Sequence, residues 1–250
     1  MEAALFVPTG TMANLIAVLN HCWGRGGEII VGDKSHIFLY EQGGVAQLGG
    51  VHTRTIPNSS DGTFSLNDVR SAVRQDDVHH PVTCLVCIEN THNMKGGKVL
   101  PINWLDELGS TCRELKVPLH MDGARLLNAA VAQNIPPKRL TQHCSSVSLC
   151  LSKGLGAPVG SLLVGTNDFI QRAIRLRKVL GGGMRQAGIL AAAGTLALSR
   201  YQITLSADHD NAKAIAKAVQ WSGSSKVSVD YDGVHSNIIM LDCITPAFTP

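Results

Sequence analysis

The chain has few aromatic residues, 4% of its 250 residues, and no long apolar run. No stretch reaches the roughly 20 consecutive apolar residues that a membrane helix needs, and the first residues lack the pattern of a signal peptide. The formal net charge is only +3, and no basic run stands out. These absences argue against a membrane protein and against a nucleic-acid partner, and they favour an ordinary globular protein.

Disulfides and metal centres are also not expected. The seven cysteines are odd in number and irregularly spaced, which argues against a disulfide framework and favours a reducing compartment, the cytoplasm. Cys84 and Cys87 have the spacing of a redox or zinc pair, but they lie in the apolar run 83–89, which indicates a strand. Residues three apart on a strand face opposite sides, so we expect the two thiols not to converge. No other group of side chains has zinc-ligand spacing, so no metal is expected.

Apolar runs with the character of strands alternate with helical runs along the chain, which is typical of an α/β fold. We expect a mostly parallel sheet of the seven-stranded type, with helices on both faces. The expected strands cover residues 28–31, 51–56, 83–89, 119–122, 146–151 and 161–164. The expected helices cover residues 11–22, 39–48, 65–74, 101–116, 168–180, 185–201 and 208–221.

The two ends of the chain suggest domain boundaries. We expect a large domain over residues 1–205 and the beginning of a small α+β domain over residues 206–250, with strand-like segments at 227–229 and 237–241. The first residues resemble the middle of a domain and the last ones stop without a capping element. We therefore expect a chain truncated at both ends.

Two of the expected strands are followed closely by a charged residue and a glycine. Asp122 ends the segment 119–122, and Lys153 follows the segment 146–151. In an open parallel sheet such strand ends face the ligand crevice. A lysine can form a Schiff base with the aldehyde of pyridoxal 5′-phosphate (PLP), and an aspartate can pair with the ring nitrogen. Each residue alone has an ordinary explanation, as a surface lysine or a helix cap, but the pair favours a PLP site.

Other residues could complete such a site. Gly10 and Thr11 precede an apolar helix, whose first amides would hold a phosphate; the alternative is a simple helix cap. His36 follows a strand end, where its imidazole could lie on the cofactor ring or move protons; the alternative is a solvent-facing loop histidine. His92 follows another strand end and has the same two interpretations.

Two arginines belong to the same set of candidates. Arg125 lies three residues after Asp122 and could reach the cofactor's phenolic oxygen or a substrate carboxylate; the alternative is a surface ion pair. Arg185 follows three glycines and would open the next helix. A guanidinium suits a phosphate, although Arg185 alone would be an ordinary surface residue.

At this point the chain resembles the low-specificity L-threonine aldolases, which have the aspartate-aminotransferase-like fold, fold type I of the PLP enzymes. The resemblance extends over nearly the whole chain and consists of several motifs in the same order. These motifs cover residues 2–12, 35–38, 88–93, 122–125, 150–160 and 180–188.

The resemblance implies how the cofactor is held. Lys153 would carry the Schiff base, Asp122 would pair with the pyridine nitrogen, and His36 would stack on the ring. The phosphate would be held by three residues, the last of them from a neighbouring subunit: Gly10, Thr11 and Arg185. Active sites shared between subunits imply a homo-oligomer, a dimer of dimers.

The resemblance also implies the reaction, which is cleavage of L-threonine or L-allo-threonine to glycine and acetaldehyde. Arg125 would bind the substrate carboxylate, and His92 and Lys178 would line the substrate end of the site. The base would be His36, His92 or a water that they position. Two alternatives stay open: another PLP-dependent lyase reaction, a β-elimination, and a catalytically silent subunit.

Overall fold

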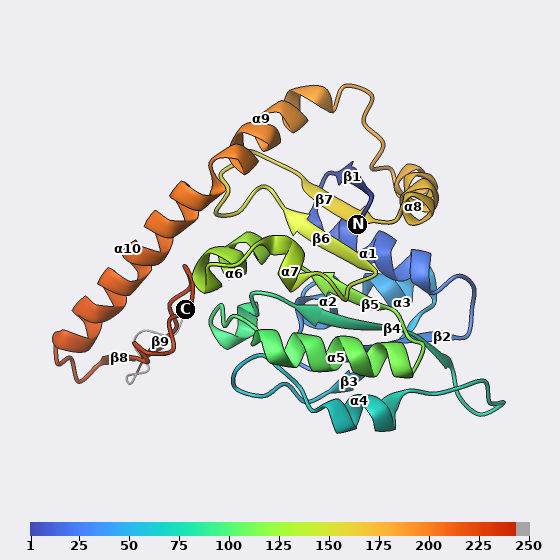
Figure 1. The fold of residues 1–250 in the computed structure, drawn as a ribbon, viewed down its shortest axis with the longest axis horizontal. Helices are drawn as coiled ribbons and strands as arrows, with labels where there is room; N and C mark the ends of the chain where they lie inside the picture. Colours follow the sequence, from blue (N-terminus) through green and yellow to red (C-terminus); the bar gives the residue numbers. More distant parts are fainter. Residues whose placement is uncertain (244–250) are drawn as a thin grey trace.

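A seven-stranded sheet forms the centre of the molecule in the computed structural model, which describes residues 1–243 (Figure 1). The strand order is β1-β7-β6-β5-β4-β2-β3. The strands are β1 (Ala3–Val7), β2 (Gly27–Gly32), β3 (His52–Ile56), β4 (Val82–Glu89), β5 (Leu119–Asp122), β6 (Ser146–Cys150) and β7 (Ser161–Gly165). Strand β7 is antiparallel to both of its neighbours, β1 and β6, whereas β2 to β6 pair in parallel. The predicted mostly parallel sheet is confirmed.

Helices cover both faces of this sheet, as predicted. Helices α1, α3 and α8 pack on one face, and α4 to α7 pack on the other. The helices are α1 (Gly10–His21), α2 (His36–Leu39), α3 (Gly44–Gly49), α4 (Leu66–Ala72), α5 (Ile102–Glu114), α6 (Leu126–Gln133), α7 (Pro137–Leu140), α8 (Asn167–Val179), α9 (Gly188–Ser199) and α10 (Tyr201–Trp221).

The buried strands show why both faces are covered. In β4, Leu85 and Cys87 pack toward the face of α1, and Val86 and Ile88 pack toward the face of α5. Alternate residues of a strand point to opposite sides, so a strand that is apolar at every position needs a helix layer on each side. This arrangement places the carboxyl ends of the parallel strands at one edge of the sheet.

Two expectations about local structure are wrong. The predicted helix 39–48 is divided into α2 and α3, because Gln42 and Gly43 adopt left-handed backbone angles, with φ of 55° and 61°. The helix expected to open at Arg185 begins at Gly188 instead. Strand β1 was not predicted, although it pairs with β7 along its whole length.

The spacing argument for Cys84 and Cys87 is wrong in one respect, because the two residues do not lie on opposite faces of β4. The register of β4 against β2 shifts between Thr83 and Leu85, so Cys84 occupies a β-bulge. The bulge breaks the alternation of the strand, and both cysteines pack against the same apolar cluster. All seven cysteines are free thiols.

The C-terminal part consists of a long helix and a small sheet. Helix α10 runs without interruption across the boundary expected between residues 205 and 206. Strands β8 (Val227–Val229) and β9 (Leu241–Cys243) pair antiparallel. The strand expected at 237–241 overlaps β9 only at Leu241. Residues 244–250, which belong to the predicted small domain, lie outside the described residues. Within residues 1–243 there is no helix both long and apolar enough to cross a membrane.

Candidate active site

A cavity of about 300 Å³ lies where β1, β5 and β6 end. It brings together five residues that the sequence singled out: Gly10, Thr11, His36, Asp122 and Lys153. The other lining residues are Pro8, Thr9, Asn14, Glu41, Ala124, Cys150, Ser152, Pro158 and Val159. Parallel strands place their carboxyl ends at the same edge, so chain segments more than 100 residues apart meet in this one cavity.

The start of α1 forms one end of the cavity. Thr9 caps the helix, because its hydroxyl oxygen accepts a hydrogen bond of 3.1 Å from the amide of Met12. The amides of Gly10 and Thr11 precede the first intrahelical hydrogen bond, so they remain available as donors. A helix start with free amides suits an anion such as a phosphate.

Asp122 is buried at the end of β5 and is held by three donors. Its Oδ2 accepts from Asn14 Nδ2 at 3.0 Å. Its Oδ1 accepts from the amide of Ala124 at 3.0 Å and from the hydroxyl of Ser148 at 3.4 Å. These contacts fix the carboxylate in one orientation and complement a negative charge on it.

His36 lies half-buried at the start of α2, beside the cavity. Burial is the main cause that lowers the pKa of His36, and the charges of Lys153 and Arg125 lower it further, against the opposing effect of Asp122. The ring of Tyr40 lies 5.5 Å from the His36 ring, centroid to centroid. His36 therefore favours the neutral imidazole, which can accept a proton.

Glu89, at the end of β4, connects two loops of the site. One carboxylate oxygen accepts from the amide of His36 at 2.8 Å, and the other accepts from the amide of Asn93 at 2.9 Å. The side-chain oxygen of Asn93 in turn accepts from Arg125 Nη1 at 3.0 Å. Burial and the negative charge of Asp122 raise the pKa of Glu89 to about 7. Glu89 thus holds the positions of both His36 and Arg125.

Four predicted site residues do not line this cavity. Arg125 borders a small neighbouring space that it shares with Lys153. His92 is buried, with 1% of the residue exposed. Neither of its ring nitrogens has a hydrogen-bond partner within the part of the chain that the structure describes. Lys178 lies in the last turn of α8, and Arg185 is exposed in the turn before α9.

Three polar residues of the site were not found from the sequence: Asn14, Glu41 and Glu89. Glu89 ends an apolar strand, which is the same signal that identified Asp122. Asn14 is one of two buried amides in the largely apolar helix α1, and a buried amide in such a run is a recognisable sign. Glu41 lies between α2 and α3, where no sequence pattern marks it as buried.

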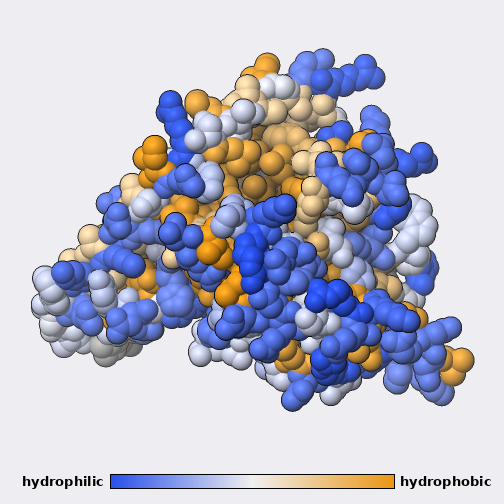
Figure 2. All heavy atoms as spheres, in the orientation of Figure 1, coloured by the Kyte–Doolittle hydropathy of each residue, from blue (hydrophilic) through white to orange (hydrophobic). Residues whose placement is uncertain are grey.

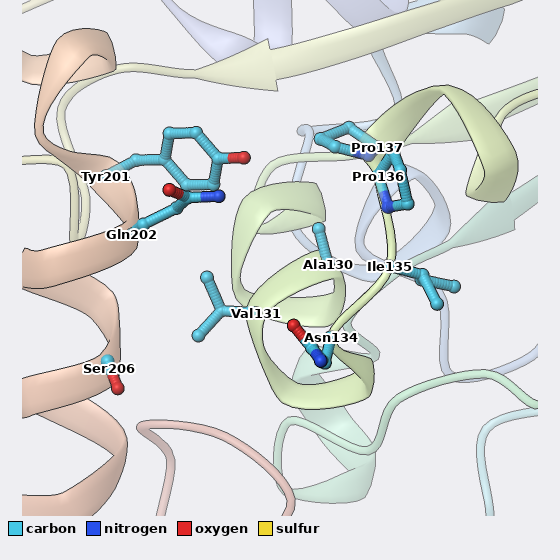
Figure 3. Close-up of a pocket in the computed structure, with 9 residues that line it drawn as sticks. All are labelled: Ala130, Val131, Asn134, Ile135, Pro136, Pro137, Tyr201, Gln202 and Ser206. Carbon is cyan, nitrogen blue, oxygen red and sulfur yellow. The ribbon is translucent and has the colours of Figure 1, made fainter.

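A larger cavity of about 620 Å³ lies between α10 and the segment that joins α6 to α7 (Figure 3). Its lining contains no lysine, histidine or carboxylate: Ala130, Val131, Asn134, Ile135, Pro136, Pro137, Tyr201, Gln202 and Ser206. Such a lining offers no acid, base or nucleophile of the kind found beside Lys153. Across residues 1–243, no three His, Cys, Asp or Glu side chains are grouped as metal ligands.

Comparison with known proteins identifies the family. The family model described as "Beta-eliminating lyase" matches residues 1–243. The chain is 51% identical over 229 residues to the low specificity L-threonine aldolase of Escherichia coli, covering 92% of this chain and 68% of that protein. It is 46% identical over 243 residues to low-specificity L-threonine aldolase 1 of Arabidopsis thaliana, covering 96% and 67%. The chain belongs to the threonine aldolases of the beta-eliminating lyase family.

The fold of this chain is similar to that of a solved threonine aldolase. A threonine aldolase of Leishmania major superposes with a TM-score of 0.78 at 24% identity, covering 91% of this chain and 66% of that one. The chain therefore spans about two thirds of the length of these relatives. Threonine aldolases are PLP-dependent lyases, so the enzyme class and the resemblance inferred from the sequence are confirmed.

Proposed function

We propose that this chain cleaves L-threonine or L-allo-threonine to glycine and acetaldehyde with PLP as cofactor, and so serves threonine breakdown and glycine formation. One observation carries the proposal: Lys153 and Asp122 line the same cavity of about 300 Å³. A lysine amine and a carboxylate on opposite ends of a small heterocycle are what a PLP site requires.

The residues of the cavity fit that cofactor. The helix start at Gly10 and Thr11 offers amides to a phosphate, and Asp122 is held ready for a protonated ring nitrogen. His36 lies beside the same space and suits the face of the ring. When bound, PLP draws electrons away from the α-carbon of an amino-acid substrate.

The chain's own residues would divide the remaining tasks. Lys153 would anchor the cofactor and give way to the substrate amine, and Asp122 would keep the ring nitrogen protonated. Arg125, held by Asn93, would bind the substrate carboxylate. Lys178 would line the substrate end of the site. Arg185 would bind the cofactor phosphate in the active site of a neighbouring subunit.

His36 is the better-placed base for the β-hydroxyl of the substrate. It lines the cavity, and its lowered pKa favours the neutral, proton-accepting ring. The pKa of His92 is lowered to about 4 by burial, so this ring is neutral too, but it is almost completely buried. His92 would therefore shape the substrate end rather than accept the proton.

A second copy of the chain is the proposed partner, in a dimer of dimers with shared active sites. Figure 2 shows apolar residues gathered around α9 and the neighbouring strands. In α9 only Gly194 is buried, whereas Ile189 and Leu196 are 80% and 54% exposed. An exposed helix of this apolar character suits a subunit interface. Seven free thiols support the cytoplasm as the location.

The test combines product analysis with identification of the lysine. We expect the chain with PLP to convert L-threonine to equal amounts of glycine and acetaldehyde. Borohydride treatment followed by peptide mass mapping should place the pyridoxyl group on Lys153. Lys153→Ala should abolish product formation and the pyridoxyl label. Lys138→Ala changes an exposed lysine on α7 and should keep product formation and the label on Lys153.

Other outcomes decide against the proposal. Ammonia with a 2-oxo acid as product would favour β-elimination, the reaction after which the matching family model is described. Cofactor binding without any product would favour the silent subunit.

A further inference from the structure

A buried chain of polar side chains lies behind Asp122, on the side of the sheet that α1 covers. Asn14 Nδ2 lies 3.0 Å from Asp122 Oδ2, and Asn14 Oδ1 lies 3.1 Å from His120 Nε2. The other ring nitrogen of His120 lies 2.8 Å from Ser146 Oγ, which is 2.9 Å from His21 Nε2. The chain thus leads from the cavity, between the sheet and α1, to the half-buried His21 at the end of α1.

The strand register builds this chain. His120 and Asp122 are two residues apart on β5 and face the same side, while Met121 between them faces the apolar core of the other side. In the neighbouring strand, Ser146 is paired with His120 and Ser148 with Asp122. Both serines are fully buried. A buried face of the sheet is ordinarily apolar, but here β5 and β6 place two polar pairs on it, His120 with Ser146 and Asp122 with Ser148.

The donors in this chain all point toward Asp122. The Asn14 amide nitrogen serves two carboxyl groups, Asp122 at 3.0 Å and Glu41 at 2.9 Å, so the Asn14 oxygen must face His120. His120 Nε2 then donates, and its Nδ1 accepts from the Ser146 hydroxyl. The Ser146 oxygen is left to accept from His21 Nε2. Aligned hydrogen bonds polarise one another, which strengthens the last one, to Asp122.

Both histidines suit this arrangement because they are neutral. Burial is the main cause that lowers the pKa of His120 to about 4 and that of His21 to about 3. A neutral imidazole has one donor and one acceptor, which is what a directed chain requires. Each link between Asn14, His120, Ser146 and His21 therefore joins one donor to one acceptor, which favours a single arrangement of the four side chains.

We propose that Asn14 and His120 are positioning residues that orient Asp122 and stabilise its negative charge for the cofactor's ring nitrogen. This inference rests on the proposed function only in that PLP is the ligand of the cavity. It assigns a role to residues that do not react themselves: Asn14 acts on Asp122 directly, and His120 acts through Asn14.

The test measures PLP affinity and the absorbance spectrum of the bound cofactor. Asn14→Leu removes the donor to Asp122 and should weaken PLP binding by roughly 10- to 100-fold, with a changed spectrum, because a hydrogen bond to a charged group is lost. The matched control is Asn20→Leu. Asn20 is also buried on α1, but its amide donates to the carbonyl of Phe169 at 2.8 Å. We expect Asn20→Leu to lower the unfolding temperature while PLP affinity stays within about threefold of the wild type.

A second pair tests the longer contact. His120→Gln can still donate to Asn14, whereas His120→Leu cannot. We expect His120→Gln to keep most of the affinity and His120→Leu to lose about tenfold. This pair also decides the matter if Asn14→Leu does not fold.

Equal affinities for His120→Gln and His120→Leu, or an equal loss for Asn14→Leu and Asn20→Leu, would overturn the inference. A wild-type chain that binds PLP but forms no glycine would overturn the proposed function and leave this result standing.

Discussion

Among single residues, Glu41 has the clearest conflict between its charge and its surroundings. It is 4% exposed, and its Oε2 has no hydrogen-bond partner within the described part of the chain. Burial and the charge of Asp122 raise the pKa of Glu41 to about 8, although the hydrogen bond from Asn14 opposes this effect. Glu41 therefore holds a proton at neutral pH.

This proton makes stability depend on pH in a known direction. Below pH 4.5, the ordinary pKa of the group, Glu41 is protonated in the folded and the unfolded chain. As pH rises from 4.5 to about 8, the unfolded chain ionises while the folded chain keeps the proton, so the free energy of unfolding falls. Glu41→Gln lacks this loss. We expect its advantage over the wild type to grow by at most roughly 1.4 kcal/mol per pH unit in this window.

Urea unfolding of the cofactor-free chain at several pH values measures this advantage. The control is Glu107→Gln, a change of an exposed glutamate on α5, which should show no comparable slope. A Glu41→Gln advantage that does not change with pH would mean that Glu41 is already ionised in the folded chain.

A site residue can be predicted only if the sequence around it carries a local signal. Asp122 and Lys153 were found because a charge followed by glycine after an apolar strand is unusual for a core. Glu41 was not found, because its burial results from the turn between α2 and α3, which only the folded chain shows. Asn14 and Glu89 carried a local signal, but the contacts that explain them lie far away in the sequence, as in the pair Asn14 and Asp122.

At the scale of elements, the start of α1 depends on a glycine for a reason of space. A Cβ atom at Gly10 would lie 2.7 Å from the sulfur of Cys150, a buried residue that lines the cavity. Gly10→Ala must therefore move Cys150, close to Lys153 in the chain, or move the helix start. We expect a loss of about 1–3 kcal/mol in stability and weaker PLP binding.

The start of α9 offers the matched control. A Cβ atom at Gly188 would meet nothing within 4 Å. Gly188→Ala should be neutral or stabilising by up to about 1 kcal/mol, because no neighbour within one chain has to move. Calorimetric unfolding and a PLP titration of both variants check these expectations. If both substitutions behaved alike, the contact between Gly10 and Cys150 would have no part in the site.

The elements also show where the sequence is informative about the fold. Strands β4 and β5 were placed because runs apolar at every position are typical of strands covered on both faces. Strand β1 was missed, because its five residues lie at the beginning of the chain and its partner, β7, follows more than 150 residues later. The division of α2 from α3 depends on a left-handed Gln42, a backbone angle that few sequences reveal.

At the scale of the whole molecule, α9 is an apolar helix that a single chain leaves largely uncovered. It follows three glycines and Arg185, and it leads into α10, which extends away from the sheet (Figure 1). Ile189 and Leu196 of α9 face solvent in one copy of the chain, whereas Ala197 and Leu198 pack on its core. An assembly that buries α9 would also bring Arg185 next to another subunit, as the proposed sharing of active sites requires.

A charged residue on α9 tests this assembly. Ile189 is 80% exposed, so Ile189→Glu should leave the fold of one chain intact and oppose burial between subunits, where an unpaired carboxylate is unfavourable. We expect sedimentation to show an oligomer for the wild type and smaller species for Ile189→Glu, with weaker PLP binding because the partner's contribution is lost. Val78→Glu is the matched control, since Val78 is 96% exposed on a loop between α4 and β4. Dissociation by Val78→Glu, or a wild type that sediments as a monomer, would argue against α9 as the interface.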